Sequence, residues 1–149
     1  MVWSLQQVMG NIKSQEAKVV DARPSGRFHG TVPEPRAGMR GGRIPGSVSV
    51  PFGEVLTATR TMKSQAELLQ VFSAAGLSWQ DDSKPPALVS SCGSGMTACI
   101  LGLALRQLDF PVETNWAVYD GSWTEYGARS DTEIVKTGAE GEEQSVTKL

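Results

Sequence analysis

The chain has 149 residues, carries 14 basic and 16 acidic side chains, and has a net charge of −2. This length corresponds to one globular domain that can bury a sizeable core, and the near balance of charge gives no electrostatic basis for binding nucleic acid or an anionic membrane. Two cysteines, with no secretion signal and no long apolar span, predict an intracellular protein of the cytoplasm or the mitochondrion. A single histidine and the cysteine spacing match no metal-ligand pattern, so we expect neither a metal nor a cofactor.

Short apolar runs alternate with amphipathic runs along the chain. The runs that predict strands are residues 18–22, 48–50, 87–91 and 117–119. The runs that predict helices are residues 4–13, 64–76 and 98–105. In the second of these helices, Ser64 and Glu67 have the spacing of an N-terminal capping box, and Gly76 supplies the stop signal. Alternating strands and helices predict an α/β fold with a parallel sheet, whose ligand site lies at the carboxyl ends of the strands.

Charge is unevenly distributed along the chain. Residues 24–46 are expected to form a long loop. Five arginines lie between residues 23 and 43, and Glu34 is the single acidic residue among them. These arginines are Arg23, Arg27, Arg36, Arg40 and Arg43. A loop of this length inside a compact domain usually serves a function. Residues 137–149 offer almost nothing to bury, so we expect a single domain at residues 1–136 followed by a mobile acidic tail.

The most informative segment is Cys92-Gly93-Ser94-Gly95-Met96-Thr97-Ala98-Cys99, between an expected strand and an expected helix. Cys92 stands where the strand ends, so its sulfur faces the N–H groups of the loop and the positive end of the helix dipole. This environment favours a thiolate, with a pKa lowered from about 8.5 to roughly 3.5–7.5. Cys92 is therefore a candidate nucleophile, the alternative being a buried structural cysteine. We expect Cys99 to be a small core residue, with a resolving thiol as the alternative.

Six short motifs follow one another in this sequence. They are Val20-Asp21-Ala22-Arg23, Gly26-Arg27-Phe28, Pro33-Glu34-Pro35-Arg36, Gly42-Arg43-Ile44-Pro45-Gly46-Ser47, the Cys92 to Cys99 segment and Tyr119-Asp120-Gly121-Ser122-Trp123. Together, from about Val19 to Arg129, they resemble the rhodanese domain, and more narrowly the second, catalytic domain of the two-domain 3-mercaptopyruvate sulfurtransferases. The resemblance implies an α/β domain with a parallel central sheet flanked by helices on both faces.

The resemblance also implies a sulfurtransferase reaction. Cys92 would attack the sulfur of 3-mercaptopyruvate, release pyruvate, and pass the persulfide sulfur to cyanide or to a thiol such as reduced thioredoxin. Thiosulfate is the less favoured donor, because relatives that prefer it usually carry basic residues where this chain has Gly93 and Ser94. Met96 replaces a more usual valine.

Residue roles follow from the same resemblance. Arg27 and Arg36 would hold the substrate carboxylate, which a planar guanidinium fork suits. Ser94 would hydrogen-bond the reacting sulfur or relay a proton. The loop residues whose N–H groups would cradle the sulfur are Gly93, Ser94, Gly95, Met96 and Thr97. The residues expected to be structural are Asp21, Arg23 and Asp120.

This chain departs from the two-domain pattern because it contains no counterpart of the first domain. In that family the site lies between the domains, and the first domain supplies an acid–base partner. This chain matches the second domain alone, which implies a missing N-terminal rhodanese domain or a different partner. His29 does not match a proton relay of the family and is expected to be a surface or loop residue.

Two other function classes are weighed against this one. A phosphatase on the same fold needs an arginine at the end of the cysteine loop to clamp phosphate, whereas Ala98 and Cys99 stand there. A non-catalytic rhodanese module typically lacks the cysteine, which this chain keeps. A sulfur-carrier or regulatory module with little turnover of its own stays as the alternative.

Overall fold

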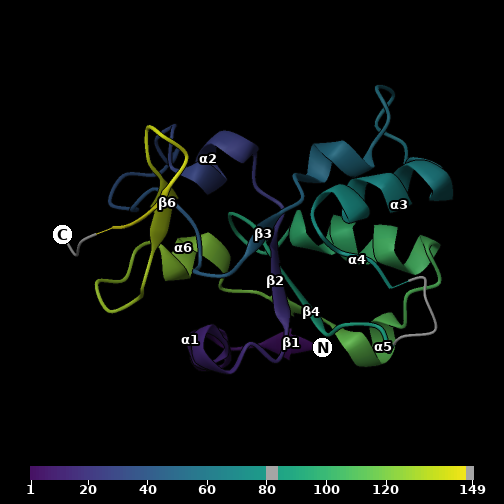
Figure 1. The fold of residues 1–149 in the computed structure, drawn as a ribbon, viewed down its shortest axis with the longest axis horizontal. Helices are drawn as coiled ribbons and strands as arrows, with labels where there is room; N and C mark the ends of the chain where they lie inside the picture. The colour runs from purple at the N-terminus through teal and green to yellow at the C-terminus, as the bar shows by residue number, and fades with distance from the viewer. Residues whose placement is uncertain (80–83, 147–149) are drawn as a thin grey trace.

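In the computed structural model, which describes residues 1–79 and 84–146, a five-stranded parallel sheet forms the centre of the molecule (Figure 1). Its strands are β1 (Val2–Trp3), β2 (Lys18–Asp21), β3 (Val48–Ser49), β4 (Leu88–Ser91) and β5 (Trp116–Tyr119). Their spatial order is β1-β5-β4-β2-β3, and every neighbouring pair is parallel. The predicted α/β fold with a parallel sheet is confirmed. Strands β2 and β4 lie side by side with Val20 opposite Ser90, so the residues that follow both strands meet at one edge of the sheet.

Helices cover both faces of this sheet. They are α1 (Leu5–Ser14), α2 (Ser25–His29), the 3-10 helix η1 (Phe52–Val55), α3 (Gln65–Ala74), α4 (Ala98–Gln107), α5 (Val112–Asn115) and α6 (Ser122–Tyr126). Side chains of a strand alternate between the two faces: Val20 and Leu88 join the core beneath α3 and α4, whereas Val19 and Val89 join the core beneath α1 and α6. The central strands β2 and β4 are therefore buried on both sides, as is typical of parallel sheets.

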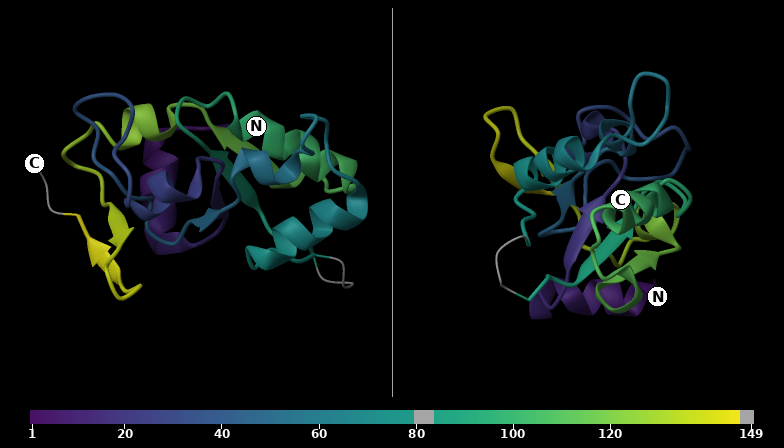
Figure 2. Two further views of the ribbon diagram at one scale, coloured as in Figure 1. Left: turned by 90° about the horizontal axis from the view of Figure 1, so that it is seen from above. Right: turned by 90° about the vertical axis from the view of Figure 1, so that its right-hand side faces the viewer.

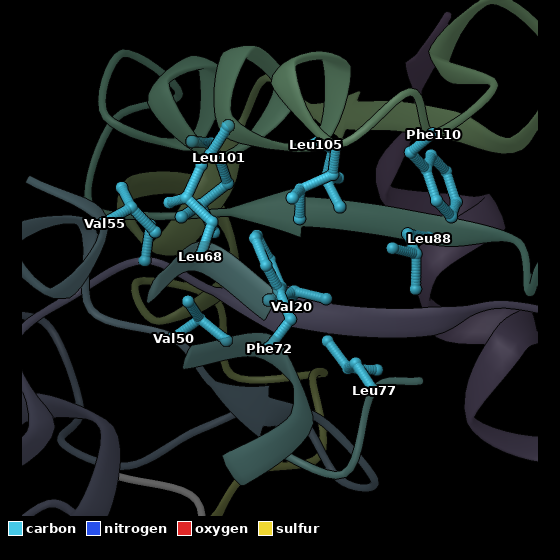
Figure 3. Packing of buried hydrophobic residues seen from close by; sticks show 14 of the residues in the cluster. Val20, Val50, Val55, Leu68, Phe72, Leu77, Leu88, Leu101, Leu105 and Phe110 are labelled. Carbon is cyan, nitrogen blue, oxygen red and sulfur yellow. The ribbon is translucent and has the colours of Figure 1, made fainter. Parts of the chain in front are cut away.

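The larger core fixes the position of α4. Leu101 and Leu105 point from α4 into the cluster that also receives Leu68 and Phe72 of α3 (Figure 3). All four side chains are essentially inaccessible to solvent, and burial of a leucine contributes about 1.5–3 kcal/mol relative to exposure. Because α4 is anchored in this way, its N-terminus is held next to the carboxyl end of β4.

The predicted helix signals are present in the structure. Ser4 caps α1, and Ser64 caps α3 through a complete capping box with Glu67. The Ser64 hydroxyl donates to the Glu67 carboxylate over 2.5 Å, and Glu67 also accepts from the Ser64 backbone N–H over 3.0 Å. Gly76 follows α3 with a φ of +77°, a conformation that favours glycine. Local chemistry thus sets where these two helices begin and where α3 ends.

The expected loop at residues 24–46 is only partly a loop, because it contains the short helix α2. Pro24 fixes the backbone just before the helix with a φ of −52°, and Gly30 ends it with a φ of +72°. Phe28 anchors the helix by burying its ring. A five-residue helix is too short to produce a recognisable apolar periodicity, so the pattern favoured a loop.

A two-stranded hairpin near the C-terminus was not predicted either. Strand β6 (Val135–Thr137) pairs with β7 (Glu143–Ser145) in antiparallel fashion, and Figure 2 shows the hairpin at the end of the molecule opposite α3. Arg43 reaches Glu143 over 2.8 Å, and Val146 packs against the core beneath α1 and α6. Residues 147–149 lie outside the described residues, and the mobility of the tail stays a prediction.

Strand β1 and the short helices η1, α5 and α6 also have no counterpart among the predicted elements. Across residues 1–79 and 84–146, no helix has both the length and the apolar character needed to cross a membrane.

Candidate active site

The loop between β4 and α4 is fastened to the turn that follows β5. The N–H of Cys92 donates to the Ser122 hydroxyl over 3.1 Å, and the Cys92 carbonyl accepts from the Trp123 N–H over 2.9 Å. The Gly93 carbonyl accepts from both the N–H and the hydroxyl of Thr124, over 2.9 and 2.6 Å. These bonds fix the start of the loop, so the Cys92 sulfur has a defined position.

The Cys92 sulfur is buried among hydrogen-bond donors. Its residue is 1% exposed. Burial alone raises the pKa of the Cys92 thiol, but donors outweigh it: the Thr97 hydroxyl and the backbone amides of Ser94, Ala98 and Thr97 together lower the pKa below its usual value. The loop thus stabilises a thiolate, and the same donors can hold a second sulfur atom attached to Cys92.

Gly95 allows the loop to pack against the β5–α6 turn. Its φ is +85°, and a Cβ at this position would lie 2.8 Å from the Asp120 carbonyl oxygen. Only glycine accommodates both the backbone conformation and the contact. The Asp120 carbonyl thus limits the loop from outside, and a structural role for Asp120 stays a prediction.

A small cavity of about 140 Å³ adjoins the loop. It is lined by Arg27, Pro35, Arg36, Met39, Gly93, Ser94 and Thr124. The structure therefore brings together both predicted carboxylate-binding arginines and the neutral pair that follows Cys92. A larger hollow of about 570 Å³ lies along the C-terminal half of α3 and is lined by none of the predicted site residues, so the small cavity is the candidate site.

The two arginines are held in different ways. Arg27 donates through Nε and a terminal nitrogen to Glu34, over 3.1 and 2.5 Å. Arg36 donates to the Thr124 hydroxyl over 3.1 Å. Arg27 therefore has a charged partner, whereas the contact described for Arg36 is with a neutral group.

Arg23 is a structural residue, as predicted. Its guanidinium pairs with Asp21 over 2.7 Å and with Glu34 over 2.8 Å, and it is 1% exposed. The guanidinium carbon also lies 3.9 Å from the centre of the Trp123 ring. A buried arginine needs such partners, and here they connect β2, the loop that contains Glu34 and α6.

The prediction that Cys99 belongs to the core is wrong, because Cys99 is exposed. Helix α4 turns Ala98 and Leu101 into the core, which leaves Cys99 on the outer face with Leu103, itself 61% exposed. The Cys99 thiol donates to the Gly95 carbonyl over 3.6 Å. Its alternative role as a resolving thiol stays a prediction.

Of the predicted site residues, Cys92, Gly95, Met96 and Thr97 are not among the residues that line the cavity, and neither is His29. Met96 is 77% exposed at the outside of the loop and is not among the lining residues. His29 ends α2, where its Nδ1 lies 2.7 Å from the Thr137 hydroxyl and its ring contacts Phe28 edge-on. The hairpin thus holds the imidazole, and neither side chain lines the space next to Cys92.

Sequence reasoning missed three residues that shape the site. Thr124 lines the cavity and contacts both Gly93 and Arg36, Ser122 accepts from Cys92, and Glu34 holds Arg27. Glu34 and Ser122 lie within two of the recognised motifs, and Thr124 directly follows one of them. Their position in or next to a motif was the sequence signal that could have identified them.

Known proteins resemble this chain over most of its length. Residues 4–129 match the model of the rhodanese-like domain. The chain is 44% identical over 133 residues to 3-mercaptopyruvate sulfurtransferase of Rattus norvegicus, covering 87% of this chain and 41% of the relative. It is 40% identical over 134 residues to thiosulfate/3-mercaptopyruvate sulfurtransferase 1, mitochondrial, of Arabidopsis thaliana, covering 90% of this chain and 33% of the relative.

Solved structures show the same likeness. The crystal structure of SseA from Escherichia coli, described as a 3-mercaptopyruvate sulfotransferase with the rhodanese fold, superposes with a TM-score of 0.64 at 35% identity, covering 82% of this chain and 42% of SseA. The sulfur transferase subunit of yeast mitochondrial complex I superposes with a TM-score of 0.78 at 37% identity, covering 91% of this chain and 45% of that one. The chain thus spans less than half the length of these relatives. From the family match, the ordered motifs and the fold, this chain belongs to the rhodanese-like domain family.

Proposed function

We propose that the chain is a catalytic rhodanese domain that takes sulfur from 3-mercaptopyruvate onto Cys92 and passes it to a thiol or to cyanide. One observation carries this proposal: the buried Cys92 sulfur accepts hydrogen bonds from the loop, next to a cavity whose wall includes Arg27 and Arg36. The names of the relatives in rat and Arabidopsis support the same donor. Thiosulfate is the less favoured donor.

The first half-reaction needs no external oxidant or reductant. The Cys92 thiolate attacks the thiol sulfur of 3-mercaptopyruvate, and a sulfur–sulfur bond forms while the donor's carbon–sulfur bond breaks. The electron pair of the broken bond leaves with the three-carbon fragment as the pyruvate enolate, which takes a proton to become pyruvate. Cys92 keeps the sulfur as a persulfide, and the loop amides hold the charge on it.

The lining of the cavity suits a monocarboxylate donor. Arg27 and Arg36 supply cationic hydrogen-bond donors for the carboxylate, and Gly93 and Ser94 place no charge beside the sulfur. Ser94 is exposed at the cavity, where its hydroxyl can hydrogen-bond the reacting sulfur or relay a proton. Thiosulfate is a dianion, so it gains less from this lining than from a loop that carries basic residues.

The second half-reaction regenerates the thiolate. A thiol acceptor, such as reduced thioredoxin, attacks the outer sulfur of the persulfide, and the Cys92 sulfur leaves as the thiolate. Cyanide takes the same sulfur as thiocyanate. Donor and acceptor thus react in turn through one covalent intermediate. The name of the Arabidopsis relative supports the mitochondrion as a compartment for this chemistry, with the cytoplasm as the other compartment proposed.

A second rhodanese domain on the N-terminal side is part of the proposal. The curated relatives are more than twice as long as the matched region, and among the described residues the cavity lining includes no histidine, lysine or carboxylate that could transfer a proton. A partner domain would close the cavity and supply that group. The same observation favours the second candidate function, a sulfur carrier with little turnover of its own.

Thiocyanate formation with each donor tests the proposal. The purified chain is mixed with cyanide and either 3-mercaptopyruvate or thiosulfate, and Cys92→Ser serves as the control. We expect faster thiocyanate release from 3-mercaptopyruvate and none from the control. Faster release from thiosulfate would overturn the assigned donor. A single release of pyruvate without further turnover would support the carrier, and no release from either donor would overturn both functions.

A further inference from the structure

Four charged side chains form a row that leads from the core to the cavity. Asp21 pairs with Arg23 over 2.7 Å, Arg23 pairs with Glu34 over 2.8 Å, and Glu34 pairs with Arg27 over 2.5 Å. We call this set the charge row. Negative and positive groups alternate in it, and each oxygen of Glu34 accepts from a different arginine.

The three side chains of the charge row that lie behind Arg27 are buried. The side chain of Arg27 is 20% exposed, whereas the side chains of Glu34 and Arg23 are each 1% exposed. Of these four residues, Arg27 is the one that lines the cavity. Glu34 therefore lies directly behind the arginine that faces the substrate, and it is itself out of contact with solvent.

Glu34 occupies one edge of the Arg27 guanidinium. Nε and Nη2 donate to Oε2 of Glu34, and Nη2 lies 3.4 Å from where a Cβ of Gly93 would stand. For Nη1, the described part of the chain shows no hydrogen-bond partner. The guanidinium is thus held along one edge, and Nη1 is left to bind a ligand beside the cysteine loop.

The two arginines of the cavity differ in the charge of their partners. The charge row holds two cations and two anions, so the charge of Arg27 is offset within it. Arg36 contacts a neutral hydroxyl and has no ion-pair partner among the described residues, so its positive charge is the one that is not offset there. Attraction of an anionic donor then depends on Arg36, and the direction in which the donor's carboxylate is held depends on Arg27.

From this arrangement we infer that Glu34 is a positioning residue, which fixes the Arg27 guanidinium so that it orients the donor's carboxylate toward attack at Cys92. The inference rests on the proposed function for its substrate. Glu34 touches neither donor nor sulfur and acts through Arg27. Positioning of this kind affects the rate of the chemical step more than the affinity, because a misplaced donor still binds but reacts slowly.

Glu34→Gln separates these two effects. The glutamine amide has one oxygen that can accept from an arginine and one NH2 group that cannot. Arg23 stays in place because it also donates to Asp21 and to the Gly42 carbonyl. Arg27 is therefore the arginine that loses its partner. We expect kcat with 3-mercaptopyruvate to fall by about one to two decades, the order that misplacement by about 1 Å costs. KM should change by less than about threefold, because the freed charge of Arg27 still attracts the anion.

Asp21→Asn is the matched control. It removes the other carboxylate from Arg23 in the same buried row but leaves both contacts between Glu34 and Arg27 in place. If the row only stabilises the fold, the two variants should behave alike in kcat and in thermal unfolding. If Glu34 positions Arg27, Asp21→Asn keeps the parent kcat, and Glu34→Gln has no further effect on kcat in the Arg27→Ala background.

A spectroscopic measurement tests the inference independently of turnover. In the parent, the Nε–H signal of Arg27 should be protected from exchange in side-chain NMR spectra; Glu34→Gln should lose that protection and Asp21→Asn should keep it. Glu34→Asp, one methylene too short to reach both arginines, gives the same test if the glutamine variant does not fold. An equally protected Arg27 in both Glu34 variants would overturn the inference. A parent that transfers no sulfur would instead overturn the proposed function, and the NMR result would still decide the role of Glu34.

Discussion

At the scale of single residues, the chemistry of the candidate site follows from a competition around one sulfur atom. Burial of Cys92 raises its pKa, and the Thr97 hydroxyl with three backbone amides lowers it by more. Of these donors, the hydroxyl is the one that a substitution removes without changing the backbone. Thr97 therefore offers a direct way to measure how the loop activates the cysteine.

Thr97→Val should raise the pKa of Cys92, because it removes the largest of the interactions that lower it. The thiolate is present above the pKa and is lost as pH falls through it, so alkylation by iodoacetamide should become slow at a higher pH in the variant. The measurement is the rate of alkylation against pH, in a Cys99→Ser background so that Cys92 alone reacts. An unchanged inflection would show that the hydroxyl does not activate the thiol.

Arg27→Ala and Arg36→Ala should each weaken the use of 3-mercaptopyruvate, because each removes charged hydrogen bonds to its carboxylate. Such bonds are worth roughly 1.5–3 kcal/mol, or about one to two decades in kcat/KM. Arg106→Ala, which removes an exposed arginine of α4 paired with Glu113, is the control and should leave kcat/KM unchanged. If Arg27→Ala and Arg36→Ala have the same kcat/KM as this control, neither arginine binds the substrate.

At the scale of elements, the sequence predicted whatever carries a strong local signal. The capping box at Ser64, the strand before Cys92 and the amphipathic run at residues 4–13 all produced elements close to the expected bounds. Helix α2 was missed because five residues between Pro24 and Gly30 show no periodicity. Cys99 was misplaced because it lies in an almost wholly apolar run, where only the packing of α4 decides which side faces the sheet.

The candidate site was predictable in part. The motifs placed Cys92, Arg27 and Arg36 in one site by resemblance, and the structure puts both arginines around a cavity beside the cysteine loop. The support behind them was not predictable, because Glu34 lies seven residues after Arg27, in the irregular backbone beyond the end of α2 at His29. Long-range contacts of this kind depend on the path of a loop, which no local pattern specifies.

Gly95→Ala should destabilise the cysteine loop and the fold. The added Cβ would meet the Asp120 carbonyl at 2.8 Å with the backbone at a φ of +85°, and such strain costs on the order of 1–3 kcal/mol. Chemical denaturation measures the free energy of unfolding. Gly10→Ala in α1 is the matched control: nothing lies within 4 Å of the added Cβ, so it should stabilise by roughly 0.5–1 kcal/mol. A neutral Gly95→Ala would mean that the loop can adopt another path.

At the scale of the whole molecule, the chain is one rhodanese-like domain with an open cavity. The relatives are more than twice as long as the region they share with this chain. Ser94 is exposed at the cavity, so water reaches the space where the donor would bind. Water weakens the charge interactions that hold the donor and stabilise the reacting groups.

A first rhodanese domain of the two-domain type, fused to the N-terminus or added in trans, should therefore raise turnover of 3-mercaptopyruvate. It would exclude water from the cavity and supply the missing proton-transfer group. The measurement is the steady-state rate of pyruvate release with and without the added domain, with an unrelated domain of similar size as the control. An isolated chain that already matches the joined form would show that its site does not lie between domains.

The most direct test of the central claim is to locate the transferred sulfur. The chain is treated with one equivalent of 3-mercaptopyruvate, alkylated, digested and analysed by mass spectrometry, alongside Cys92→Ser and Cys99→Ser variants. We predict one extra sulfur on the peptide that contains Cys92, retained in Cys99→Ser and absent from Cys92→Ser. An extra sulfur on Cys99 alone, or pyruvate release by Cys92→Ser at the parent rate, would contradict the assignment of Cys92 as the nucleophile.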